Sequence, residues 1–164
     1  MAREYGVRVL LGLLGVLAQI LPAWSAAPGR IEVAGAPFTA AAIAKLPIVE
    51  DKISFWTDHG QLNAAFAGPL LWTVLNAAHA VGPANPKAAV RGYVLVTGSD
   101  GYTAVIALGE IAPAFEDKRV ILAETMDGKP LGAGHLRVVV PGDARGGRSV
   151  RDVVSIAVLT PPAL

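Results

Sequence analysis

The tract "GYVLVTGSDGYTAVIAL", Gly92 to Leu108, restricts the possible fold more than any other stretch of the chain. Two runs rich in aliphatic and β-branched residues flank the short polar segment Gly98-Ser99-Asp100-Gly101. Asp-Gly between two such runs is a strong signal of a β-hairpin, because both residues tolerate the backbone of a tight turn. We therefore predict two antiparallel strands here. Asp100 and Gly101 are interpreted as turn formers, because a hydrolase nucleophile loop requires a strand-to-helix context.

Other segments predict further short strands. Residues 49–56 and 61–68 are expected to form a second hairpin, with Asp58, His59 and Gly60 in its turn. Single strand-like runs occupy residues 30–35, 119–126, 135–142 and 153–159. The run at 135–142 is almost unbroken in its apolar character, so we expect it to be buried on both faces.

Only two segments are typical of helices. Thr39 can cap a brief helix that Leu46-Pro47 would end. The tract "GPLLWTVLNAAHAVG" is the clearest helix: Pro69 suits its first turn, and Gly82-Pro83 is expected to stop it. Its apolar residues at helical spacing are Leu71, Val74, Leu75 and Ala78. Six or more strands with a few short helices predict an α+β domain built on a mixed β-sheet.

The first 27 residues are typical of a secretory signal peptide. Basic residues precede the apolar run Val9–Leu21, and small residues follow it, so cleavage is expected after Ser25 or Ala27. The alternative is an uncleaved membrane anchor, but this run is shorter than the roughly 20 residues that span a bilayer. We therefore expect a periplasmic or secreted domain, 28–164, that meets the membrane only during export.

The composition excludes several classes of function. Removing residues 1–27 leaves equal numbers of basic and acidic residues, so the formal net charge of the remainder is zero. Nonspecific nucleic-acid binding requires a basic surplus, so we expect no nucleic-acid partner. The sequence has no cysteine, which excludes disulfides, lipid-anchored lipoproteins, thiolate chemistry and cysteine-ligated metals.

The loop "PGDARGGRSVRD", residues 141–152, carries the clearest candidate site. The loop brings Arg145, Arg148 and Arg151 together with three glycines, and closely spaced guanidinium groups with flexible backbone N–H groups suit a phosphate or another oxyanion. The alternative is a solvated loop whose arginines pair with the neighbouring Asp143 and Asp152.

Histidine and tryptophan residues give weaker signals. His59, His79 and His135 lie far apart in the sequence and lack metal-ligand spacing, so we predict no metal site. Trp56 and Trp72 lie in a predicted strand and a predicted helix, where large aromatic side chains usually pack in the core. Lining a pocket is the alternative for both.

Five ordered motifs resemble the molybdopterin-binding domain of the sulfite-oxidase type. They are "IEVAGAPFTAAAIAKLP", "FAGPLLWTVLNAAHAVG", "SDGYTAVIALGEI", "ILAETMDGKPL" and "LRVVVPGDARGGRSVRDVVSIAV", which together span residues 30–159. The resemblance implies the sulfite-oxidase-like fold and molybdopterin as a cofactor. It also implies that Arg148, Ser149 and Arg151 contact a pterin phosphate or a substitute anion.

The departures from this family shape the functional hypothesis. Its molybdenum enzymes use a cysteine thiolate as a metal ligand, and their closing loop reads Arg-x-Val-Lys-Trp, whereas this chain has no cysteine and reads "RSVRD" from Arg148 to Asp152. We therefore expect an exported domain without molybdenum redox catalysis, which binds a small anion or a partner protein near residues 145–151. One alternative is a molybdopterin-dependent oxidoreductase, or a subunit of one, with a non-cysteine metal ligand. Another is a ligand-free structural or assembly module.

Overall fold

The computed structural model describes residues 30–81 and 90–161. The expected signal peptide, 1–27, lies outside the described residues. Strands are the main regular structure of the domain, and its helices are short, which confirms the predicted α+β class with a mixed sheet. Among the described residues, no helix has the length and apolar character needed to cross a membrane.

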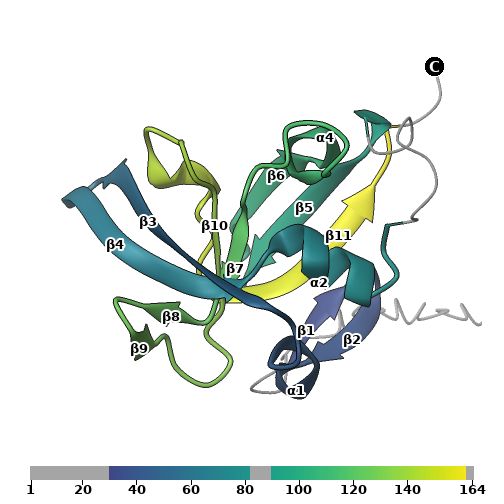
Figure 1. Cartoon of the computed structure of the whole chain (residues 1–164), viewed down its shortest axis with the longest axis horizontal. Coiled ribbons are helices and arrows are strands. Elements are labelled where there is room, and N and C mark those ends of the chain that lie inside the picture. Colours follow the sequence, from purple (N-terminus) through teal and green to yellow (C-terminus); the bar gives the residue numbers. More distant parts are fainter. Residues whose placement is uncertain (1–29, 82–89, 162–164) are drawn as a thin grey trace, which may run out of the picture.

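A five-stranded sheet forms one layer of the domain (Figure 1). Its strand order is β2-β1-β11-β5-β6, and β1 pairs with β11 in parallel while the other neighbours are antiparallel. The first strand of the described chain therefore lies beside the last one and runs in the same direction. The strands are β1 Arg30–Val33, β2 Ala36–Thr39, β5 Tyr93–Gly98, β6 Thr103–Ala107 and β11 Val153–Leu159.

The β5–β6 connection is the turn expected from the sequence. The N–H of Gly101 donates to the carbonyl of Gly98 at 3.0 Å, and Asp100 Oδ1 accepts from the N–H of Tyr102 at 2.9 Å. Gly101 has φ +82°, a conformation that glycine adopts without steric cost. Asp100 and Gly101 therefore shape the hairpin.

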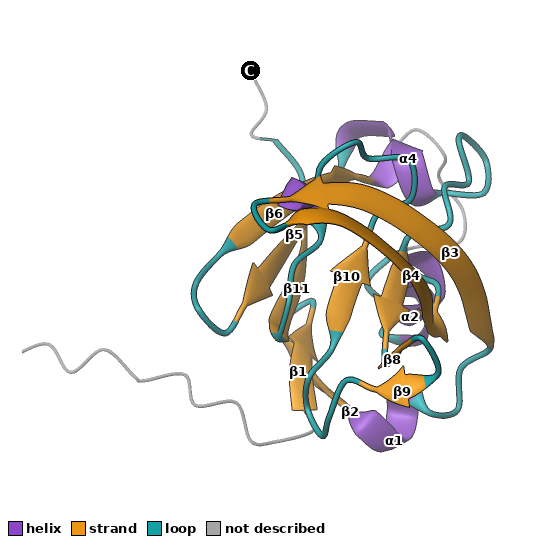
Figure 2. Ribbon diagram, turned by 90° about the vertical axis from the view of Figure 1, so that its left-hand side faces the viewer, coloured by secondary structure: helices purple, strands orange, loops and turns teal. Residues whose placement is uncertain are grey.

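A second hairpin, β3 Ile48–Thr57 and β4 Gly60–Pro69, arches over the rest of the domain (Figure 2). Its turn contains His59 as predicted, and Thr57 Oγ1 donates to the carbonyl of Gly60 at 2.8 Å. The short strands β8 Thr125–Met126 and β9 Lys129–Pro130 extend this sheet, while β7 Ile121–Ala123 pairs with β10 Arg137–Val139.

Two predicted strands differ from the observed ones. The run at 119–126 divides into β7 and β8 at Glu124, because β7 pairs with β10 and β8 pairs with β4. The run at 135–142 shortens to the three residues of β10. Burial on both faces is confirmed for β10, since Val138 and Val139 are fully buried in two different apolar clusters, whereas His135 and Gly142 at the ends of the run are exposed.

The helices are shorter than the sequence pattern. Thr39 caps α1, Ala40–Ile43, as predicted, because its Oγ1 accepts from the N–H of Ala42. Helix α2 spans Leu71–Ala77. Pro69 was expected in its first turn but is the last residue of β4, where it lies opposite Ile48.

The end of α2 is made by a backbone motif. His79 has φ +53°, and the N–H groups of His79 and Ala80 donate to the carbonyls of Asn76 and Leu75. These two bonds form a Schellman motif, which closes the helix before residue 82. The predicted stop signal at Gly82-Pro83 lies outside the described residues.

The core has two parts. The larger cluster joins α2 to the five-stranded sheet through the fully buried Leu71, Val74 and Leu75. The smaller cluster lies under the β3–β4 hairpin and contains Phe55 and Phe66. Trp72 is half-buried against the larger cluster. The core prediction for Trp56 is wrong, since it is 54% exposed on the outer face of β3.

Candidate functional site

The closing loop between β10 and β11 is held in place by three backbone anchors. Trp56 N–H donates to the carbonyl of Ala144 at 3.0 Å, Tyr102 Oη donates to the carbonyl of Gly147 at 2.6 Å, and Val138 N–H donates to the carbonyl of Val150 at 2.9 Å. The loop includes one turn of 3-10 helix, η1 Gly146–Arg148. These anchors join the loop to β3, to the β5–β6 hairpin and to β10.

One glycine is required by the close approach of the loop to β3. A Cβ atom at Gly146 would lie 2.7 Å from the ring of Phe55. The glycines that suggested a phosphate-binding loop therefore also serve packing, because any larger residue at Gly146 would displace a buried aromatic ring.

Arg148 forms ion pairs with two carboxylates. Its Nε and Nη2 donate to the two Asp143 oxygens at 2.9 and 2.6 Å, and its Nη1 donates to both Glu110 oxygens at 3.0 Å. The hydrogen bonds that Arg148 donates to Asp143 raise its pKa above the usual range, and Glu110 adds to this effect, while burial acts in the opposite direction. The charge of Arg148 therefore joins the loop to α4, Leu108–Ile111.

Glu110 is the centre of this network. Lys118 Nζ lies 3.3 Å from its Oε2, and Arg148 occupies the other side. Burial alone would raise the pKa of Glu110, but hydrogen bonds and charge from Arg148 and Lys118 outweigh it and lower the pKa overall. Two cations on one partly buried carboxylate make this a structural ion-pair cluster.

Arg137, on β10, is a candidate that the sequence analysis missed. Its guanidinium carbon lies 5.6 Å from the ring centroid of Phe55 and 5.4 Å from that of Phe66. Its Nε donates to Ser149 Oγ at 2.9 Å. Within residues 30–81 and 90–161, no carboxylate lies at ion-pair distance from it.

The electrostatic surroundings of Arg137 favour an incoming anion. Burial, and after it the charge of Arg151, lower the pKa of Arg137, while Asp152 acts in the opposite direction. A guanidinium group that is partly desolvated, aromatic-stacked and close to a second cation gains most from a negatively charged ligand. The sequence signal for it was a single arginine within the apolar run "LRVVV".

The structure separates the three predicted loop arginines. Arg148 faces α4, Arg151 is exposed and acts electrostatically on Arg137, and Arg145 is exposed and bridges to Trp56 through the backbone. Of the site residues predicted from the sequence, Ser149 and Arg151 therefore lie with Arg137, while Arg145 and Arg148 have different neighbours.

The three histidines occupy unrelated positions. His59 lies in the β3–β4 turn, His79 ends α2, and His135 Nδ1 lies 2.6 Å from Asp152 Oδ1. Within the described part of the chain, no three His, Asp or Glu residues are grouped so that they could hold a metal ion.

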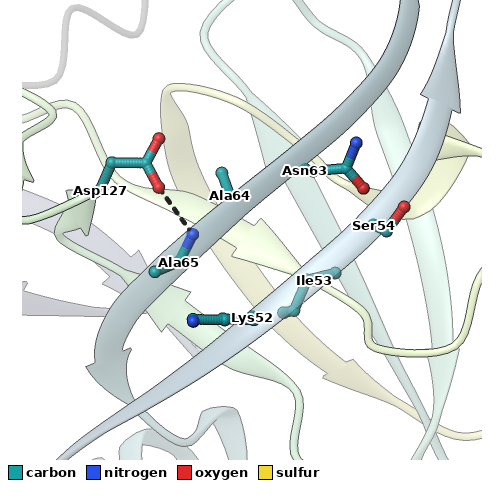
Figure 3. A pocket seen from close by; sticks show the side chains of 7 residues that line it. All are labelled: Lys52, Ile53, Ser54, Asn63, Ala64, Ala65 and Asp127. Carbon is teal, nitrogen blue, oxygen red and sulfur yellow. Dashed lines mark hydrogen bonds between the residues drawn. The ribbon is translucent and has the colours of Figure 1, made fainter.

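Two hollows lie away from the closing loop. A shallow one of about 380 Å³ lies on the outer face of the β3–β4 hairpin (Figure 3). Asp127 closes one side of it, where its Oδ1 accepts from the N–H of Ala65 at 2.8 Å, and Lys52 and Asn63 line it. A deeper cavity of about 420 Å³ lies between β1, α1 and the segment that leads into β10.

Comparison with known proteins agrees with this architecture. A family model described as "oxidoreductase molybdopterin binding domain" matches residues 44–163. Among the solved structures that match is the crystal structure of the sulfane dehydrogenase SoxCD from Paracoccus pantotrophus, with a TM-score of 0.61 and 17% sequence identity. The match covers 79% of this chain and 37% of that chain, so the similarity shows the fold. The comparison with curated proteins found no match.

Proposed function

The chain belongs to the oxidoreductase molybdopterin binding domain family, and on this premise we propose that it is an exported member that binds a small anion without molybdenum redox catalysis. The observation that carries the proposal is Arg137, a half-buried cation that has aromatic neighbours and no carboxylate at ion-pair distance among the described residues. The family resemblance noted in the sequence is confirmed by the family model.

The residues of this chain fit the two halves of a molybdenum cofactor differently. The metal of the family's enzymes requires a cysteine thiolate, and the sequence contains none. Residues 30–81 and 90–161 also present no cluster of other donors that could replace it. The anionic phosphate of a pterin, in contrast, suits Arg137, Arg151 and Ser149. We therefore propose binding of an anion, with a pterin phosphate as one candidate, and we derive no redox step.

Arg137 and four residues of the closing loop have distinct roles in the proposed site. The Nη groups of Arg137 and the guanidinium group of Arg151 donate charge-assisted hydrogen bonds to the anion. Ser149 Oγ already accepts from Arg137 Nε, so its hydroxyl proton is free to donate as well. Arg148 positions the loop through Asp143 and Glu110. Arg145, at the outer edge beside Trp56, is a secondary contact.

Two further parts of the proposal rest on the sequence. The apolar segment before residue 28 supports export to the periplasm or beyond. A protein partner that presents a carboxylate or phosphate to Arg137 and Arg151 is the other ligand compatible with this chemistry.

The first experiment measures cofactor content in protein exported to the periplasm of molybdenum-replete cells. Molybdenum is assayed by mass spectrometry and oxidised pterin by fluorescence, both on the same purified sample. Pterin without metal, or neither component, is the expected result. Stoichiometric molybdenum would overturn the proposal and would favour an oxidoreductase with a non-cysteine ligand.

A second experiment tests the anion site directly. Isothermal titration with inorganic phosphate, and then with molybdopterin-derived pterin phosphate, is compared for the wild type and Arg151→Ala. Arg91→Ala is the matched control, because Arg91 is an exposed arginine next to the opposite end of β5. We expect Arg151→Ala to weaken binding at least tenfold and Arg91→Ala to leave it unchanged. Absence of binding in all three proteins would favour a ligand-free assembly module.

A further inference from the structure

The deeper cavity is formed by segments far apart in the sequence. It has a volume of about 420 Å³ and lies where β1 and α1 meet the β7–β8 junction and the segment 130–136. Residues of α1 and β9 both contribute to its lining. A concave site of this size, built on several elements, is the usual form of a small-molecule pocket.

The walls of the cavity are largely apolar. Ile31 and Ile43 are 3% and 1% exposed, and they line the cavity from β1 and α1. Pro130 and Leu136 line the opposite side. Such walls favour a ligand with a hydrocarbon body, because contact with them removes apolar surface from water.

Glu124 brings a carboxyl group to this apolar cavity. Its backbone is fixed on both sides, since its N–H donates to the carbonyl of Ala67 at 2.8 Å and its carbonyl accepts from the N–H of Leu131 at 2.9 Å. Its side chain lines the cavity, and burial raises its pKa. In the described part of the chain, no side chain forms an ion pair with it. Glu124 is therefore a partly buried carboxylate whose charge no neighbouring cation in the described residues balances.

The other charged residues of the cavity do not supply this cation. His135 Nδ1 lies 2.6 Å from Asp152 Oδ1, so this ring nitrogen is directed to the closing loop and not to Glu124. Arg30 lines the cavity but is exposed, and solvent weakens the field of an exposed charge more than that of a half-buried one. Glu124 therefore decides the charge preference of the cavity.

From this arrangement we propose that the cavity binds a small molecule with an apolar body and a protonated amine, and that the amine forms an ion pair with Glu124. The apolar body lies against Ile31 and Ile43. The site is separate from the anion site of the closing loop, and neither proposal depends on the other.

The test uses three probes of similar shape and different charge: n-pentylammonium, n-pentanol and pentanoate. Binding to the exported, purified protein is followed by NMR chemical shifts at pH 7. We expect saturable binding of pentylammonium, with pentanol at least tenfold weaker and pentanoate weaker still. Stronger binding of pentanoate, or no saturable binding of any probe, would overturn the proposal.

Variants locate the interaction. Glu124→Gln keeps the shape and removes the charge, so we expect at least tenfold weaker binding of pentylammonium. Ala40→Phe, at an exposed position that lines the cavity, should block all three probes without disturbing the core. Glu116→Gln is the matched control, because Glu116 pairs with Lys118 elsewhere. Equal effects of Glu124→Gln and Glu116→Gln would contradict the proposal.

A cross-test separates the two sites. Arg151→Ala should leave pentylammonium binding unchanged, and Glu124→Gln should leave phosphate binding unchanged. If Arg151→Ala weakened both ligands equally, the cavity would be an extension of the closing-loop site rather than a site of its own, and the inference would fail.

Discussion

Arg148 and Arg137 lie eleven residues apart along the chain but in opposite electrostatic surroundings. Arg148 donates four hydrogen bonds to two carboxylates, whereas Arg137 stacks near two phenylalanine rings and donates to one hydroxyl. Two glutamates differ in the same way: Glu110 has two cationic partners, while Glu124 has none among the described residues. Charges that are already balanced hold a structure together, and unbalanced ones are available to a ligand.

The largest expected effect comes from Arg148→Ala. The change leaves Asp143 and Glu110 partly buried without their shared cation, so we expect the free energy of unfolding to fall by about 2–3 kcal/mol. Urea denaturation at pH 7 measures it. Arg145→Ala is the control and should change stability by less than about 0.5 kcal/mol. Unchanged stability together with lost phosphate binding would make Arg148 a ligand contact and break the comparison.

Glu110→Gln tests the same network through pH. Because the folded-state pKa of Glu110 is lowered, its stabilisation is present above the unfolded value of 4.5 and is lost as the pH falls through the folded pKa. We expect a loss of about 1–2 kcal/mol at neutral pH that shrinks as both proteins are acidified. Urea denaturation from neutral to acidic pH measures it. A difference independent of pH would show that packing rather than charge is lost.

Arg137→Gln should weaken both binding and stability. No carboxylate loses a partner, but two cation–π contacts worth about 0.5–1 kcal/mol each are lost, so we expect the free energy of unfolding to fall by about 1–2 kcal/mol. Phosphate affinity, measured by titration calorimetry, should fall at least tenfold. Arg137→Lys keeps the charge without the planar fork, and an intermediate affinity is expected. Full affinity in Arg137→Gln would remove Arg137 from the anion site.

The smallest effect is expected for Glu124→Gln, and it has the opposite sign. Burial raises the folded-state pKa of Glu124, so its ionisation is disfavoured in the folded protein and stability is lost as the pH rises through that pKa. Glutamine should therefore stabilise the ligand-free protein at pH 7 by about 0.5 kcal/mol, with no difference at acidic pH. Thermal melts at both pH values measure this. A loss of stability at pH 7 would mean that Glu124 already has a partner.

Much of the fold could be predicted from local sequence patterns. The hairpins at 57–60 and 98–102, the cap at Thr39 and the two-sided burial of β10 depend on turn chemistry and periodicity, which act over a few residues. The division of residues 119–126 into two strands at Glu124 could not be predicted. It arises because the two halves pair with different strands, and pairing between distant segments leaves no local signal.

The candidate site could be predicted from the sequence only in part. The spacing of Arg145, Arg148 and Arg151 identified the loop but did not predict their directions, since each direction depends on neighbours from other elements. The prediction that Trp56 packs in the core was wrong for a related reason. The alternation of β3 puts Phe55 and Trp56 on opposite faces, and only the packing of the hairpin on the domain decides which face is buried.

Composition, turn residues and motif order by themselves determined the α+β class, the family and the loss of the cysteine ligand, because these depend on residue identity. The tertiary structure alone decided which charges are balanced. A guanidinium group or carboxylate acts over a few ångströms, and the neighbours of Arg148, Arg137 and Glu124 come from segments that only folding brings within that distance.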